Sequence, residues 1–113
     1  MGIREDLAAA VSTVAGCTGY RVMPDTPQAG DGWPSWVSAT VLTGCSLAVV
    51  WHVWVVMAGA DHGTVVDAED PVIPALAAAC GEVGQVDLIE PVQLAGTDPA
   101  GNLLPCVRVQ VTT

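Results

Sequence analysis

The sequence contains no lysine and no phenylalanine. Its only strongly basic side chains are Arg4, Arg21 and Arg108, against twelve acidic residues, so the formal net charge is −9. Proteins hold nucleic acids and anionic membranes mainly through lysine and arginine. We therefore expect neither tight binding to DNA or RNA nor attachment to an anionic membrane surface.

The sequence also lacks an apolar segment long enough to cross a membrane. Its most apolar stretch, Gly44 to Ala60, has 17 residues. As a helix it would span about 26 Å, against about 30 Å of hydrocarbon. No Lys or Arg lies near either end to orient it. The acidic residues Glu5 and Asp6 stand where a signal peptide would be basic and then apolar, so we expect no secretion signal.

Patterns that indicate metal or phosphate chemistry are missing as well. The four cysteines form no Cys-x-x-Cys pair and have no histidine at ligand spacing. We expect them to be small buried hydrophobic residues in a reducing cytoplasm. No glycine-rich phosphate loop is present. The sequence therefore predicts no metal, no cofactor and no enzymatic activity.

Two histidines are available as catalytic bases. His52 lies in an apolar strand, and His62 lies in a turn close to the densest acidic cluster, which comprises Asp61, Asp67, Glu69 and Asp70. This cluster lacks the pattern of a calcium loop, which favours a solvated and partly helix-capping role. A small acidic hydrolase or ligand-binding module that uses His62 remains the alternative from a different class.

The most distinctive segment that is present runs from Ser46 to Met57 and contains five valines and two tryptophans. Such residues favour a β-strand. With alternating sides, Leu47, Val49, Trp51, Val53, Val55 and Met57 face one way, and Ala48, Val50, His52, Trp54 and Val56 face the other. Both sides are apolar, so we expect burial on both, with a second molecule covering the latter side.

The remaining elements are expected around this strand. Apolar spacing predicts a helix over Ile3 to Val14, and capping by Asp70 predicts another over Pro71 to Cys80. Turn formers and β-rich segments predict the following elements: a short extended segment at Tyr20 to Met23, a long loop from Pro24 to Pro34, and strands over Ser35 to Thr43, Gln85 to Ala95 and from Leu103 onward. Pro91 and Pro105 place the last two strands at edges or bulges.

These elements predict one α+β domain over residues 1–113. It has a mainly antiparallel sheet of four to five strands packed with two helices. Tryptophan is enriched at interfaces. The expected contact residues are therefore those in the loop or on the second side of the central strand, namely Trp33, Trp36, His52, Trp54 and Val56.

Several segments of the chain resemble those of a known protein family. They are Gly-Ile-Arg-Glu-Asp-Leu-Ala-Ala-Ala-Val, Gly-Tyr-Arg-Val-Met-Pro-Asp, the Val/Trp strand, and Val-Asp-Leu-Ile-Glu-Pro-Val to Val-Arg-Val-Gln-Val. The chain is similar in these segments, in length and in element order to tail terminator proteins of long-tailed actinobacterial phages. The resemblance covers nearly the whole chain.

This resemblance implies a structural virion protein in the neck of the tail, assembled in the host cytoplasm. It implies a hexameric ring that ends polymerisation of the tail tube protein and joins the tail to the head connector. DNA would pass through without specific binding, along a channel for which Asp61, Asp67, Glu69 and Asp70 are the expected lining acids. A head-tail stopper or another neck connector ring is the alternative.

Overall fold

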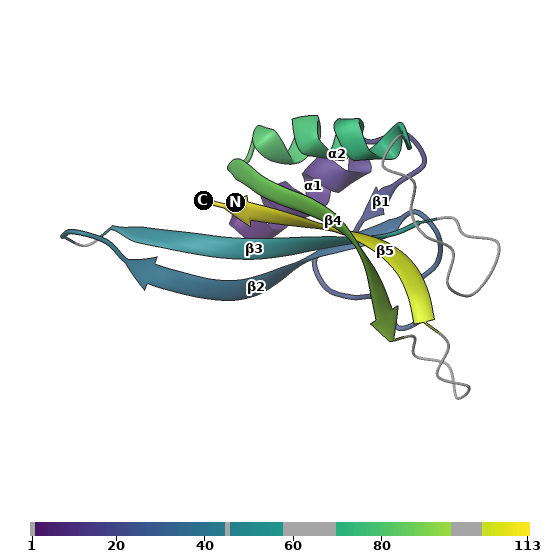
Figure 1. Cartoon of the computed structure of the whole chain (residues 1–113), viewed down its shortest axis with the longest axis horizontal. Coiled ribbons are helices and arrows are strands. Elements are labelled where there is room, and N and C mark those ends of the chain that lie inside the picture. The colour runs from purple at the N-terminus through teal and green to yellow at the C-terminus, as the bar shows by residue number, and fades with distance from the viewer. Residues whose placement is uncertain (1, 45, 58–69, 96–102) are drawn as a thin grey trace.

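The computed structural model describes residues 2–44, 46–57, 70–95 and 103–113, with the side chains of residues 95 and 103 left out. These residues form two helices and five strands (Figure 1): α1 Ile3–Ser12, β1 Thr18–Gly19, β2 Asp31–Val41, β3 Leu47–Val56, α2 Val72–Gly81, β4 Gln85–Ala95 and β5 Leu103–Thr112. The predicted α+β class with two helices is confirmed.

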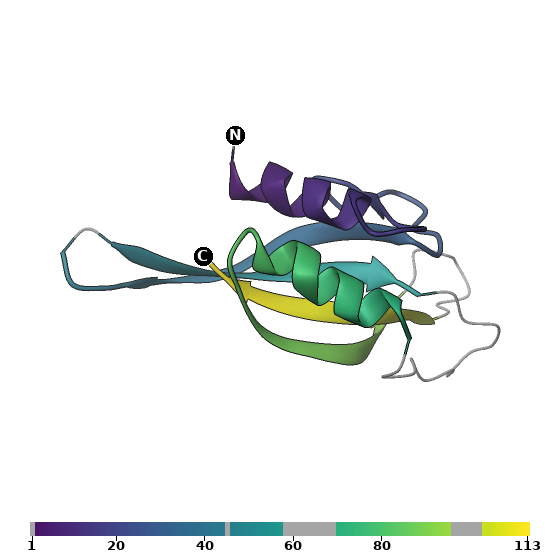
Figure 2. The same cartoon turned by 90° about the horizontal axis from the view of Figure 1, so that it is seen from above.

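The strands form one sheet in the order β1-β2-β3-β5-β4. The short β1 runs parallel to β2, and every other neighbouring pair is antiparallel. Both helices lie on the same side of this sheet, as the view from above shows (Figure 2). The sheet therefore has one side that faces the helices and one that does not.

The helix α1 is fastened to the sheet from its first turn. Glu5 and Asp6 lie in that turn, where the helix dipole favours negative charge. The Arg4 guanidinium donates to the backbone oxygens of Arg21 (2.9 Å) and Pro34 (3.2 Å) and lies 5.4 Å from the centre of the Trp51 ring. These contacts join the helix to both the loop after β1 and the strand β2.

The start of α2 follows the sequence-based expectation closely. The Asp70 carboxylate accepts a hydrogen bond from the Val72 backbone N–H at 2.9 Å, which satisfies one of the free donors at the helix start. The intervening residue, Pro71, loses no hydrogen bond there because it lacks an N–H group. The helix then buries Leu76 and Cys80 against the sheet.

The main core fills the space between the helices and the sheet. It consists of the following residues, all of which are almost fully buried: Leu7, Val11, Val14, Val53, Val55, Met57, Leu76, Cys80, Val107, Val109 and Val111. A second, smaller cluster lies on the side away from the helices. It is built on Trp33, Val56 and Cys106.

The predicted strand at Tyr20 to Met23 is wrong, because the strand in this region is β1, at Thr18–Gly19. A Cβ atom on Gly19 would lie only 1.8 Å from the Ala8 backbone oxygen. The backbone of α1 therefore approaches the sheet at a position where only glycine fits.

The long loop is shorter than predicted, because β2 begins at Asp31 and includes Trp33 and Pro34. The Tyr20 N–H, directly after β1, donates to the Gly32 oxygen, so the backbone polar groups of Gly32 point toward the β1 side of β2. Alternate residues of a strand direct their backbone groups to the same side, so the Pro34 nitrogen also points toward the β1 side. By Pro34 the strand β1 has already ended. The missing proline N–H therefore removes no ladder hydrogen bond.

The edge position expected from prolines is confirmed for β4 and wrong for β5. The strand β4 lies at the edge and has an irregularity between Val86 and Leu88. The strand β5 lies between β3 and β4. Pro105 is tolerated because it precedes the first residue that pairs with β3, and its oxygen accepts from the Met57 N–H (2.8 Å) just beyond the end of β3.

The expected two-sided burial of β3 holds only near its end. Val53 and Val55 are buried on the helix side, and Val56 is buried on the other. The first half of the strand, from Leu47 to Val50, is exposed or half-buried. This half belongs to a hairpin that leaves the body of the molecule.

Candidate interaction surfaces

The hairpin formed by β2 and β3 projects from the sheet as an arm, which we define as residues 37–44 and 46–48 (Figure 1). Thr113 exchanges backbone hydrogen bonds with Val49, and beyond that point no further described strand flanks the pair. The molecule is consequently elongated, with extents of 48 × 29 × 22 Å. An isolated two-stranded hairpin is marginally stable in water, so the arm gains from being covered.

Large apolar side chains are exposed on this arm. Val41 is 73% exposed and Leu47 is 55% exposed, and the two are direct cross-strand partners. Val37 and Leu42 are exposed as well. The sequence has no charged residue from Gly32 to Ala60, so the whole arm is uncharged. Contiguous exposed apolar side chains of this kind mark interaction sites.

The second surface is the part of the sheet that faces away from the helices, here called the open face. It is formed by side chains that share neighbouring positions in the register of β3, β5 and β4: His52, Trp54, Leu88, Glu90, Arg108 and Gln110. No described helix covers them (Figure 2). Leu88 is 48% exposed, although it is apolar.

Charge on the open face is internally compensated. The Arg108 guanidinium forms an ion pair with Glu90 and lies 5.4 Å from the centre of the Trp54 ring. Burial, followed by the positive charge of Arg108, lowers the pKa of His52, although Gln110 and Glu90 partly oppose this shift. His52 is therefore neutral at pH 7, and the six side chains carry no net charge. Asp87 borders the face and accepts a hydrogen bond from Thr112.

The structure brings two of the predicted contact residues together on this face. The rings of His52 and Trp54 meet edge to face, with centroids 6.1 Å apart. Trp36 lies elsewhere. It pairs with Trp51 on the helix side, at the base of the arm, where it is more than half exposed.

The other two predicted contact residues, Trp33 and Val56, are buried within the chain itself. They form the second cluster with Cys106, and Met23 from the loop after β1 packs against it. The sequence could not show this cover, because it depends on the alignment of β2 with β5 across β3. The structure thus gives both residues a core role in place of the expected contact role.

Of the four acids expected to line a channel, only Asp70 is described. Its carboxylate caps α2, in agreement with the helix-capping interpretation. Asp61, Asp67 and Glu69 lie outside the described residues, as does His62 of the alternative hydrolase hypothesis. The structure therefore leaves the channel role of this cluster as a prediction.

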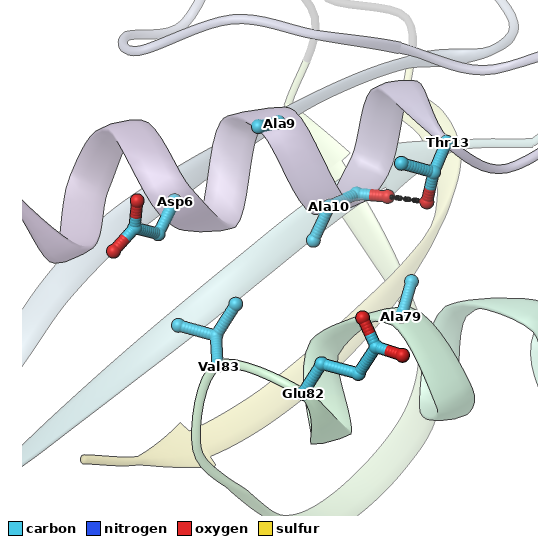
Figure 3. A pocket seen from close by; sticks show the side chains of 7 residues that line it. All are labelled: Asp6, Ala9, Ala10, Thr13, Ala79, Glu82 and Val83. Atoms are coloured by element: carbon cyan, nitrogen blue, oxygen red, sulfur yellow. Dashed lines mark hydrogen bonds between the residues drawn. The ribbon is translucent and has the colours of Figure 1, made fainter. Parts of the chain in front are cut away.

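A cavity of about 390 Å³ lies between α1 and the C-terminal end of α2 (Figure 3). Three of its seven lining residues are alanines; Asp6 lies in α1, and Glu82 directly follows α2. Its hydroxyl group, on Thr13, donates to the Ala10 backbone oxygen at 2.6 Å. The lining thus has two carboxylates, and its one hydroxyl is hydrogen-bonded to the backbone of α1.

The described cysteines are poor nucleophiles. Burial raises the pKa of both Cys80 and Cys106 to about 11, and burial together with the charge of Asp70 raises the pKa of Cys17. A thiol reacts as its thiolate, which is scarce under these conditions. Among the described residues, no group of three or more His, Cys, Asp or Glu side chains could hold a metal ion.

Each of the three arginines has a partner within the chain. Arg4 holds backbone oxygens, Arg21 pairs with Glu5 at 2.9 Å, and Arg108 pairs with Glu90. Within the described segments no helix is long and apolar enough to cross a membrane. Comparisons with protein-family models, curated protein sequences and solved structures find no match to this chain.

Proposed function

We propose that the chain is a structural protein of a phage tail, a tail terminator that assembles into a hexameric ring on the head-proximal end of the tail tube. The observation that carries this proposal is the combination of an uncharged apolar arm and a separate open face on one small α+β domain. Two different surfaces on one subunit allow heterologous contacts, and such contacts form rings when their rotation closes.

Two further observations support the proposal. The α+β fold is the one that the resemblance to tail terminators implies. Six copies of the chain would carry a formal charge of −54, which is six times −9. Phosphates are repelled by such a surface, so genomic DNA could cross the ring without being held.

In this function the ring binds the last layer of the tail tube and leaves no surface to which another tube subunit can add. The head connector then binds the opposite side of the ring. The subunit acts by occupying a growing end, so its role needs no catalytic residue.

The mass of the purified chain in solution, measured by light scattering over a series of concentrations, tests the ring. Negative-stain images of the heaviest species should show closed rings of six. A closed dimer at every concentration would contradict the proposal.

Addition of the chain to polymerising tail tube protein tests termination. Tubes should stop growing and carry a cap at one end, which electron microscopy measures as a shorter length distribution. A ring that leaves tube length unchanged but binds preformed tail ends or the head connector would instead indicate a head-tail stopper or another neck connector.

A further inference from the structure

The arm and the open face are two surfaces without net charge on a strongly acidic chain. Copies with a charge of −9 repel one another, so they associate best through surfaces that lack negative charge. The arm has no charged residue, and on the open face Glu90 is compensated by Arg108. Charge therefore favours these two surfaces as the places where copies meet.

The direction of the apolar side chains decides how the two surfaces can meet. In the register of β2 and β3, Val41 and Leu47 of the arm lie on the same side of the sheet as Trp36 and the helices. The open face lies on the opposite side. The arm of one copy can therefore extend beneath the sheet of a second copy that has the same orientation, so that apolar side chains meet the open face.

The alternative pairing of two arms is less favourable. An arm-to-arm contact needs one copy turned over by a two-fold axis, and it leaves both open faces uncovered. A contact between copies in the same orientation covers both surfaces, because each copy presents one of each kind.

The dimensions of the two surfaces limit the strength of one contact. The arm extends about 17 Å from residue 37 to residue 42 at about 3.4 Å per residue, with its two strands about 5 Å apart. The open face crosses three strands, or about 10 Å. A contact of this extent is smaller than the roughly 800 Å² per partner of a standard stable complex. A single contact is therefore weak, and an assembly in which every copy makes two is favoured.

We propose that the arm of each copy packs on the open face of a second copy in the same orientation, so that each copy gives one arm and receives another. Leu47 and Val41 contact the neighbour's Leu88 and the ring of its Trp54. This contact joins neighbouring subunits of the proposed ring. Only the closure of six copies into a ring rests on the proposed function.

Two variants test the contact, each with one surface intact. Leu47→Asp places a charge on the arm, and Leu88→Asp places one on the open face. Both residues are about half exposed, so neither change opens the core. Circular dichroism and thermal unfolding check that both variants fold. The control is Val22→Asp, because Val22 is 65% exposed but belongs to neither surface.

Each of the two variants alone should be monomeric, with its association weakened at least about thirtyfold, as expected when a charge replaces a central apolar contact. A 1:1 mixture should form a dimer of twice the chain mass and nothing larger, because only one arm and one face in each pair are functional. Native mass spectrometry measures these species. The Val22→Asp variant should assemble like the wild type.

Three results would overturn the arm-to-face contact. One is a Leu88→Asp variant that assembles like the wild type, as two-fold arm pairing predicts. Another is a mixture that stays monomeric even at about 1 mM, where a single weak contact is populated. The third is a wild-type chain that is monomeric even at about 1 mM, where weak contacts are populated.

The ring function can fail separately. Open filaments or rings of another number, combined with mixed-variant dimers, would keep the contact and contradict the hexamer. Six-membered rings that persist in both variants would keep the ring and contradict the contact.

Discussion

Arg108 should contribute measurably to stability through its two partners on the open face. The Arg108 and Glu90 side chains are 29% and 34% exposed, so their ion pair contributes about 0.5–1 kcal/mol. The guanidinium above the Trp54 ring adds about 0.5–1 kcal/mol. The change Arg108→Met keeps the aliphatic contact and removes both interactions. It should lower the free energy of unfolding by about 1–2 kcal/mol.

Urea unfolding followed by circular dichroism measures this change. The Leu47→Asp background is used because assembly would raise the apparent stability of some variants more than of others. The Glu90→Gln single variant and the Arg108→Met/Glu90→Gln double variant complete a double-mutant cycle, and the coupling energy should be about 0.5–1 kcal/mol.

Arg21→Met is the matched control for Arg108→Met, because it changes the net charge identically and also breaks an ion pair with a glutamate. The Arg21 side chain is 68% exposed, so its loss should change stability by no more than about 0.5 kcal/mol. Equal losses for the two arginine variants would refute the reasoning, because only net charge would then matter.

Three other predictions concern the body of the molecule. Gly19→Ala should destabilise the folded chain by about 3 kcal/mol or more, because the added Cβ would lie 1.8 Å from the Ala8 backbone oxygen. The loss should appear as a lower melting temperature, and an unchanged melting temperature would contradict the close approach of the two backbones. Since the folded state lowers the pKa of His52 below 6.5, the unfolded chain binds the extra proton, so stability should fall as the pH decreases from about 7.5 to about 5.5. His52→Gln should make that decrease in melting temperature smaller, and an identical decrease would exclude His52 as its source. At pH 8, alkylation of Cys80 and Cys106 should be about 100-fold slower in the folded chain than in urea, because their pKa of about 11 exceeds the reference value of 9.0. Mass spectrometry of the peptides measures the alkylation rates, and equal rates would show that the thiols are accessible.

Local patterns predicted the elements of this fold well. The apolar spacing of Leu7 and Val11 defines α1, the Asp70 side chain caps α2, and the bounds of β4 are those predicted. Each of these features depends on residues close together in the sequence. The α+β class followed from their order.

The arrangement of strands could not be predicted in the same way. The position of β5 beside β3 depends on pairings such as Cys106 with Val56, which are distant in sequence. That alignment also decides that Val56 is covered while His52 is not. The uncharged stretch after Gly32 was the available signal for the arm, but its projection from the body is a tertiary property.

The place of β5 in the sheet has a consequence for the order in which the molecule is made. The hairpin of β2 and β3 can pair as soon as both strands have been synthesised, but β4 has no described strand partner until β5 follows it. The apolar arm therefore exists during synthesis before the sheet that supports it is complete. A nascent chain without β5 would expose the inner edge of β3 together with the arm, so premature release at that stage should give aggregation rather than a smaller folded domain.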